Sequence, residues 1–199
     1  MMTTSGGIIL AGGKSARMGQ DKALLEVDGR SLIAQVVATV RPLVSEIVVV
    51  ADVPEKYDNA LGRIVADLLP GVGPVGGILT GLTALGEGSH LVVSCDMPAL
   101  NVRVLQFLLE AATPEWDAVV PETAGRPEPL CAVYQHTAAP KLRAFLDTGR
   151  RAAYQALECL QTRRVDEETL RRLDPEGLGF TNLNTPEDLE RFRQRKHTL

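Results

Sequence analysis

The sequence predicts an α/β protein in which a mostly parallel, doubly wound sheet forms the core. Short apolar runs rich in β-branched residues alternate with helical patterns, and this alternation is typical of such sheets. The chain has 199 residues, of which 45% are hydrophobic, enough for one sizeable core. Because no charged or Gly/Pro/Ser-rich run divides the sequence, we expect a single domain covering residues 1–199.

The strands are expected where apolar residues form short continuous runs bounded by glycine or polar residues. A continuous run, unlike an alternating one, indicates a strand that is buried on both faces, as in a parallel sheet. Five segments fit this description: GGIILA (6–11), EIVVVA (46–51), RIVA (63–66), HLVVSC (90–95) and DAVVPE (117–122).

The helices are expected between these runs. Residues 31–43 carry apolar side chains at a spacing of three to four, and Ser31 is a suitable N-cap. Near the end of the chain, Thr185-Pro186 followed by two acids predicts the start of a terminal helix, because proline suits the first helical position. The other helical patterns cover 74–85, 101–112 with Asn101 as cap, 137–147 and 150–160, and a short run, RRV, follows the last of these.

Charge, hydropathy and cysteine content exclude several classes of function. The net charge is −4 with dispersed lysines and arginines, so we expect no nucleic-acid partner. No apolar run approaches the ~20 residues of a membrane helix, and no basic leader precedes the first strand. Cys95, Cys131 and Cys159 are odd in number and lack metal-ligand spacing, which favours reduced, buried thiols and a cytoplasmic location.

The stretch IILAGGKSARMGQDKALL, residues 8–25, contains the ingredients of an ATP-binding P-loop but not its spacing. A P-loop requires G-x-x-x-x-G-K-[ST], which would place glycine at position 8, where the chain has Ile8. Gly7 is one residue out of register and falls inside the predicted strand. The dinucleotide fingerprint G-x-G-x-x-G is also missing from this segment.

The same stretch remains a candidate for binding a phosphorylated ligand. Ligands of doubly wound sheets bind outside the carboxyl ends of the strands, and Gly12 and Gly13 follow the first strand. Glycines allow close approach to the backbone, and the cations Arg17 and Lys22 could neutralise phosphates and a pyrophosphate leaving group. The alternative is that these cations are solvated loop residues.

Two carboxylates follow later strands. Asp96, in SCDMP, comes directly after the fourth strand, where it could bind Mg²⁺ together with substrate phosphates. From the pattern alone, a turn or helix-cap aspartate is an equally good interpretation. Asp67 ends the third strand and is a weaker candidate of the same kind.

Two further segments could contact a ligand. The glycine-rich stretch 70–82 leads into a helix whose first N–H groups could face an anion or a base, or it could simply allow close packing. Asn182 and Asn184, two positions apart, would place both amides on one side of an extended segment, although both also suit turns and caps. The three histidines show no ligand spacing, so no zinc site is expected.

Several separated motifs resemble one family. LAGGKSARMGQDKALL is similar to the signature of the molybdenum cofactor guanylyltransferases, the MobA family of nucleotidyltransferases. The similarity continues in order through GPVGGILTGL, SCDMP, RPEPLCAVY, GRR and FTNLNTPEDL, and covers about residues 8–190. The fold that the resemblance implies is a single-domain, three-layer, Rossmann-like nucleotidyltransferase. Its nucleotide-binding half would span about 8–100 and its acceptor-substrate half about 101–195.

The resemblance implies transfer of GMP from GTP to molybdenum-bound molybdopterin, with release of pyrophosphate. Arg17, Lys22 and Asp96 would be catalytic, and Asp96 would bind Mg²⁺. Arg150 competes with Arg151 for the place facing molybdopterin. By position, GTP would be bound by Leu10, Ala11, Gly12, Gly13, Lys22, Asp67, Gly73, Gly77 and Asp96, and molybdopterin by Arg151, Asn182 and Asn184.

Three alternatives remain at this stage, one of which is a sugar-phosphate nucleotidyltransferase, although such enzymes usually carry additional domain length that this chain lacks. A related transferase uses CTP and attaches CMP, but its relatives more often open with Ala-Ala-Gly, whereas this chain has Ala11-Gly12-Gly13. The chain could also be a non-catalytic chaperone that binds nucleotide or molybdopterin. Other proteins of molybdenum cofactor synthesis and acceptor molybdoenzymes are possible partners implied by the resemblance.

Overall fold

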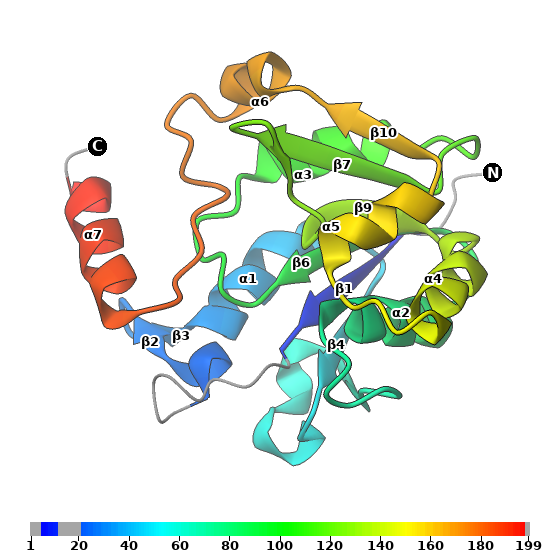
Figure 1. The fold of residues 1–199 in the computed structure, drawn as a ribbon. Helices are drawn as coiled ribbons and strands as arrows, with labels where there is room; N and C mark the ends of the chain where they lie inside the picture. The colour runs from blue at the N-terminus through cyan, green and yellow to red at the C-terminus, as the bar shows by residue number, and fades with distance from the viewer. Residues whose placement is uncertain (1–4, 12–20, 198–199) are drawn as a thin grey trace.

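The computed structural model describes residues 5–11 and 21–197, and its centre is one mostly parallel sheet (Figure 1). The strand order is β10-β7-β9-β6-β1-β4-β5, and β8 pairs with β7. A separate antiparallel hairpin joins β2 and β3. The strands are β1 (Gly6–Leu10), β2 (Glu26–Val27), β3 (Arg30–Ser31), β4 (Glu46–Ala51), β5 (Arg63–Ala66), β6 (Ser89–Ser94), β7 (Ala118–Thr123), β8 (Arg126–Pro127), β9 (Cys131–Gln135) and β10 (Thr162–Val165).

The strand directions bring several strand ends to one edge of the sheet. β1 runs parallel to both β4 and β6, so that Ile8 lies opposite Val48 and Val92. β5 continues this parallel set beside β4, and β10 runs parallel to β7. Only β9, among the long strands of the described sheet, runs against its neighbours β6 and β7. The carboxyl ends of β1, β4, β5 and β6 therefore meet at one edge.

Helices cover both faces of this sheet and make three layers (Figure 1). Consecutive residues of a strand point to opposite faces, so Ile9 packs with α1 and α3, whereas Ile8 packs with α2 and α4. The α/β fold with a mostly parallel sheet, predicted from the sequence, is confirmed. The helices are α1 (Leu32–Val40), α2 (Pro74–Leu85), α3 (Val102–Glu110), α4 (Ala138–Asp147), α5 (Ala153–Ala156), α6 (Glu167–Leu173) and α7 (Pro186–His197), and the short 3-10 helices are η1 (Lys22–Leu24), η2 (Arg41–Leu43), η3 (Pro54–Lys56), η4 (Asn59–Leu61) and η5 (Leu157–Cys159).

The predicted caps begin their helices in the structure. The Ser31 hydroxyl accepts a hydrogen bond from the Ala34 amide at 3.4 Å, and the Asn101 side chain accepts one from the Arg103 amide at 2.9 Å. The helix predicted over 150–160 is wrong in extent, because only α5 and η5 form there. These two short elements pack Ala156 and Leu157 into the core.

The segment that contains α7 packs against elements from the first part of the chain. Leu183 and Phe192 are buried in a small cluster with Val27 of the hairpin and Leu32 of α1. Figure 1 shows α7 beside the β2–β3 hairpin, far from α4. This packing brings the residues before α7 to the carboxyl edge of the sheet.

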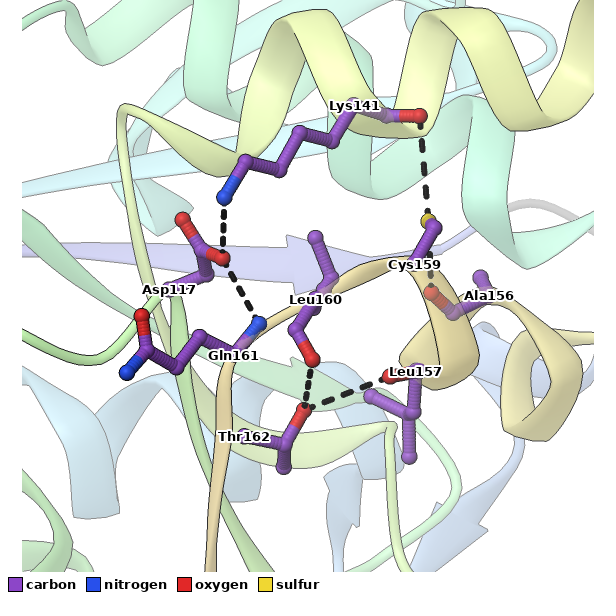
Figure 2. A network of polar contacts seen from close by, with 8 residues as sticks. All are labelled: Asp117, Lys141, Ala156, Leu157, Cys159, Leu160, Gln161 and Thr162. Carbon is purple, nitrogen blue, oxygen red and sulfur yellow. Dashed lines mark hydrogen bonds and ion pairs between the residues drawn. The ribbon is translucent and has the colours of Figure 1, made fainter.

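A polar network lies at the amino ends of β7 and β10, opposite the carboxyl ends of the parallel strands (Figure 2). Asp117, which precedes β7, is 6% exposed and accepts hydrogen bonds from Lys141 Nζ at 2.5 Å and from the Gln161 amide at 2.7 Å. It thereby joins α4 to the starts of β7 and β10. Cys159 lies nearby and donates to the Ala156 carbonyl at 2.9 Å, but it is exposed. The expectation of buried thiols is thus correct for Cys95 and Cys131 and wrong for Cys159.

In the part of the chain that is described, no helix combines the length and apolar character needed to cross a membrane.

Candidate functional site

Three segments distant in sequence meet at the ammonium group of Lys22. Lys22 Nζ lies 2.7 Å from Asp96 Oδ2 and 2.7 Å from Asn184 Oδ1. The Lys22 and Asp96 side chains are 15% and 16% exposed, so this ion pair is largely but not fully shielded from water. An ion pair in this position gains more from the lower local dielectric than one on the open surface. We call these three residues the lysine junction.

Local structure fixes each member of the lysine junction. Lys22 opens η1, whose N-cap Asp21 accepts a hydrogen bond from the Ala23 amide at 3.2 Å. Asp96 lies in the turn after β6, and its carbonyl accepts a hydrogen bond from the Leu183 amide at 2.9 Å. Because Leu183 is buried, this backbone bond holds Asn184 beside Lys22. Asn182, two residues earlier, is half-buried.

The second oxygen of Asp96 provides a test of whether a divalent cation fits here. Asp96 Oδ1 is buried and has no hydrogen-bond partner among the described residues. A buried carboxylate oxygen without a donor is costly unless a ligand satisfies it. No group of three or more potential metal-ligating side chains occurs within 5–11 and 21–197. The single unsatisfied oxygen of Asp96 fits a cation such as Mg²⁺, which commonly uses one or two carboxylates and completes its shell with water and substrate phosphates.

A cavity of about 620 Å³ opens at the carboxyl edge of the sheet and includes Asp96 in its wall. This volume is within the range of small-molecule binding sites. Five of the predicted site residues line it: Leu10, Asp67, Gly73, Gly77 and Asp96. The remaining wall is formed by Val50, Ala51, Asp52, Pro70, Gly71, Pro74, Ser94 and Leu130.

The glycines of the cavity wall have two different physical roles. Gly73 has φ of +95° and caps α2, a backbone conformation that favours glycine. Gly77 lies within α2, and a Cβ there would come within 3.0 Å of Leu10 Cδ2. Glycine at 77 therefore keeps the cavity open beside the end of β1.

Asp67 is held firmly at the cavity wall. Its Oδ1 accepts hydrogen bonds from the Thr80 hydroxyl at 2.8 Å and from the Leu69 amide at 2.9 Å. Thr80 is buried on α2, so the carboxylate is fixed between the end of β5 and that helix. The hydrogen bonds use one carboxylate oxygen, and Oδ2 takes no part in them.

Other predicted site residues lie apart from the cavity or outside the described residues. Ala11 is buried, and its carbonyl accepts a hydrogen bond from the Tyr57 hydroxyl at 2.9 Å. Gly12, Gly13 and Arg17 lie outside the described residues. Arg151 is exposed and donates to the carbonyls of Leu146 and Arg150, each at 2.7 Å, without lining the cavity.

Arg150, the competitor of Arg151, is also engaged elsewhere. Its guanidinium pairs with Glu158 at 2.5 Å and lies 5.0 Å from the centre of the Phe145 ring. Neither guanidinium contacts the lysine junction in this arrangement, so the choice between the two arginines stays a prediction.

Several residues of the cavity wall were not predicted from the sequence. Asp52 follows β4 directly, so the strand-end rule that selected Asp67 and Asp96 also points to it. Ser94, the last residue of β6, could be found in the same way. The strand-end rule does not reach Leu130, because this residue precedes β9, a strand that was not predicted, although it stands within the motif RPEPLCAVY.

The buried cysteine beside Asp96 is not a nucleophile. Burial, together with the neighbouring Asp96 charge, raises the pKa of the Cys95 thiol to about 12. The thiol form therefore persists at neutral pH, whereas a nucleophilic cysteine requires the thiolate. Among the described residues, no histidine lines the cavity. The described residues of the site thus offer charged and positioning groups, and neither a reactive cysteine nor a histidine base is among them.

The cavity lies at the strand ends, is rich in glycine, and adjoins a lysine and a carboxylate with one unsatisfied oxygen. These features are typical of α/β proteins that bind phosphorylated nucleotides. Residues 7–164 match the MobA-like NTP transferase domain. The chain belongs to this family and is a nucleotidyltransferase.

Relatives and solved structures agree with this assignment. The chain is 36% identical over 194 residues to a "Probable molybdenum cofactor guanylyltransferase" of Chloroflexus aggregans, covering 92% of this chain and 91% of the relative. It is 36% identical over 186 residues to the "Molybdenum cofactor guanylyltransferase" of Desulfosudis oleivorans, covering 93% and 92%. The crystal structure of "Molybdopterin-guanine dinucleotide biosynthesis protein A" from Archaeoglobus fulgidus superposes with a TM-score of 0.84 at 31% identity, covering 98% of this chain and all of that one.

Proposed function

We propose that this chain transfers GMP from GTP to the terminal phosphate of molybdenum-bound molybdopterin, giving the guanine dinucleotide cofactor and pyrophosphate. Family membership and the names of its relatives support the reaction class and both substrates. The structural observation that carries the proposal is the lysine junction, because it adjoins a nucleotide-sized cavity and joins the two halves of the chain. Guanylyl transfer requires two anionic substrates to meet at such a boundary.

In this reaction an oxygen of the acceptor phosphate forms a bond to the α-phosphorus of GTP. The bond from the α-phosphorus to the bridging oxygen breaks, and pyrophosphate leaves with the electron pair. The acceptor oxygen is already anionic at neutral pH, so the reaction needs no general base. This agrees with a cavity wall that, in its described part, contains no histidine. The work of the protein is to position like-charged groups and to neutralise them.

Lys22 and Arg17 are assigned to the phosphates in this proposal. The Lys22 ammonium already lies 2.7 Å from an anionic oxygen, so it can exchange Asp96 for a phosphate oxygen with little movement. Asp96 would hold Mg²⁺ through Oδ1, the atom without a hydrogen-bond donor. When bound, Mg²⁺ supplies positive charge to the α-phosphate and the leaving pyrophosphate.

The nucleotide half, about 8–100, provides the cavity. Asp67, with Oδ1 fixed by Thr80, would accept hydrogen bonds from the nucleoside through Oδ2. Gly73 and Gly77 would shape the base side. The backbone of Leu10, Ala11, Gly12 and Gly13 would contact the guanine nucleotide.

The acceptor half, about 101–195, contributes Arg151, Asn182 and Asn184 to molybdopterin. Asn184 is the best supported of the three, because its amide oxygen shares the Lys22 ammonium with Asp96. Other proteins of cofactor synthesis and acceptor molybdoenzymes would be partners, and the cytoplasm, where GTP is available, would be the location.

The experiment supplies the purified chain with Mg²⁺, molybdenum-bound molybdopterin and either GTP or CTP labelled at the α-phosphate. We expect the label on the pterin with GTP only, together with one pyrophosphate for each labelled product. Transfer from CTP at the same rate would instead identify a cytidylyl or unselective transferase.

Binding of both substrates without pyrophosphate release would support the chaperone alternative and contradict the proposal. A reaction without molybdopterin controls for hydrolysis at the α-phosphate of GTP, because attack by water there releases pyrophosphate and labelled GMP without any acceptor.

A further inference from the structure

One buried hydroxyl contacts two points of the chain that are separated in sequence by residues 12–20. The Tyr57 hydroxyl lies 2.9 Å from the carbonyl oxygen of Ala11. It also lies 3.2 Å and 3.1 Å from the two carboxylate oxygens of Asp21. Ala11 follows β1, and Asp21 precedes η1. A single atom of Tyr57 thus holds the end of the first strand and the start of the helix that carries Lys22.

Asp21 transmits this constraint to the lysine junction. Its carboxylate caps η1 through the Ala23 amide and pairs with Lys56 Nζ at 3.4 Å. Lys22 is the first residue of η1, so any shift of the cap moves the ammonium that contacts Asp96 and Asn184. Tyr57, Asp21 and Lys22 therefore form a continuous chain of contacts into the site.

The hydroxyl of Tyr57 acts as a donor throughout the physiological pH range. Burial and the Asp21 charge both raise its pKa, which keeps the phenol protonated. A phenol has one proton, so it donates to the Ala11 carbonyl and the Asp21 carboxylate in a shared or alternating way. In either case both acceptors stay within hydrogen-bond distance of one oxygen.

We propose that Tyr57 is a positioning residue of this transferase, whose hydroxyl holds the Ala11 carbonyl and the Asp21 carboxylate together and so fixes Lys22 beside Asp96. The inference rests on the proposed function, since Lys22 is the phosphate-binding group there. Tyr57 itself does not line the cavity and touches no substrate in this assignment. Its effect on the reaction passes through the placement of Lys22.

The test replaces only the hydroxyl. Tyr57→Phe keeps the ring, which is 8% exposed and packs in the core, and removes the bonds to Ala11 and Asp21. Tyr134→Phe is the matched control, because Tyr134 is also buried and donates its hydroxyl to a backbone carbonyl, that of Pro129, at 2.9 Å. Both variants lose one buried tyrosine hydroxyl, but only the hydroxyl of Tyr57 contacts Asp21.

For Tyr57→Phe we expect kcat for guanylyl transfer to fall about tenfold, the effect of slight misplacement of a group that acts in the transition state. The KM for GTP should change less than kcat. Tyr134→Phe should show a similar decrease in Tm and a kcat close to that of the unmodified chain. In an Asp21→Asn background the effect of Tyr57→Phe should shrink, because the two changes act on the same contact.

Amide hydrogen exchange at residues 21–25 tests the inference without any substrate. The Ala23, Leu24 and Leu25 amides bond to Asp21 and Lys22, so they report the order of η1 directly. Exchange should be faster in Tyr57→Phe and unchanged in Tyr134→Phe. If the unmodified chain transfers no GMP, the proposed function fails while this measurement still tests the placement of η1.

The inference is overturned if Tyr57→Phe leaves both kcat and the exchange of 21–25 unchanged. It is also overturned if Tyr134→Phe lowers kcat to the same extent, because the loss would then reflect general stability. Should Tyr57→Phe fail to fold, Asp21→Asn alone must lower kcat and speed amide exchange at residues 23–25. A normal kcat and normal exchange in Asp21→Asn would refute the positioning role of Tyr57.

Discussion

Lys22 and Asp96 form an ion pair at 2.7 Å that uses only one of the two Asp96 oxygens, Oδ2. The other oxygen, Oδ1, is buried and has no donor among the described residues. The carboxylate is thus neutralised on one side and unsatisfied on the other. This asymmetry suits a group that faces a protein cation and a bound cation at the same time.

Removing the charge of Lys22 should abolish most activity. Lys22→Met keeps the length of the side chain but cannot neutralise phosphate, and we expect kcat to fall by about 10²–10³-fold, as when one preorganised electrostatic group is deleted. Steady-state kinetics of GMP transfer measures the loss. Lys141→Met, which removes the lysine that pairs with Asp117 at the other edge of the sheet, should retain kcat near normal. Near-normal turnover of purified Lys22→Met would refute its assignment.

The role assigned to Asp96 predicts a change in the metal requirement. Asp96→Asn keeps the shape of the side chain but loses its charge, so activity should fall by about 10²-fold or more and should need higher Mg²⁺ concentrations. Activity of the unmodified chain should disappear with a chelator and return with Mg²⁺. Asp58→Asn, at an exposed cap of η4, is the control. An unchanged Mg²⁺ titration curve for Asp96→Asn would exclude Asp96 as the ligand.

A methyl group added at Gly77 should interfere with GTP. Its Cβ would lie 3.0 Å from Leu10 Cδ2, so the Leu10 side chain must shift, and both residues line the cavity. We expect the KM for GTP to rise about tenfold, equivalent to ~1.4 kcal/mol, within the usual cost of overpacking. Gly76→Ala, one position earlier in α2, is the matched control, because its nearest contact is Leu69 at 3.3 Å, outside the cavity wall. Equal KM values for the two variants would contradict this prediction.

The buried His90 should make the fold less stable in mild acid. Its Nδ1 accepts a hydrogen bond from the Gly6 amide at 3.1 Å, so the proton resides on Nε2, which faces the Gly86 carbonyl at 2.9 Å. Burial lowers the pKa of His90, so between its folded pKa and 6.5 the unfolded chain binds more protons. The free energy of unfolding is therefore highest above pH 6.5 and decreases as the pH falls through this window.

Urea denaturation between pH 5 and 8 measures this dependence. The slope of unfolding free energy against pH should be smaller in His90→Gln, because the glutamine side chain cannot titrate. Identical slopes would show that His90 makes no contribution.

The sequence predicted the parallel strands well because their signal is local. Runs such as EIVVVA are continuous, apolar and short, and β4 occupies the same six residues. Pro74 opens α2 as proline does at a first helical turn, so this helix matches its predicted range. The strand-end rule then selected Asp67 and Asp96 without knowledge of the strand order.

What the sequence could not predict depends on contacts between distant segments. β9 is antiparallel and lies between β6 and β7, an arrangement that only strand pairing determines. Asn184 was selected from its spacing to Asn182, but its contact with Lys22 depends on the burial of Leu183 and Phe192. The β2–β3 hairpin against which they pack was also missed, because its strands have only two residues each.

The bond between Lys22 and Asn184 joins positions that are 162 residues apart. Ribosomes release a chain from its N-terminus, and domains begin to fold in that order. The first six strands are therefore synthesised well before Asn184, so Lys22 and Asp96 can meet before the amide that completes their junction exists. The set of contacts around the Lys22 ammonium is therefore complete only after the segment that carries Asn184 has been synthesised, long after Lys22 and Asp96.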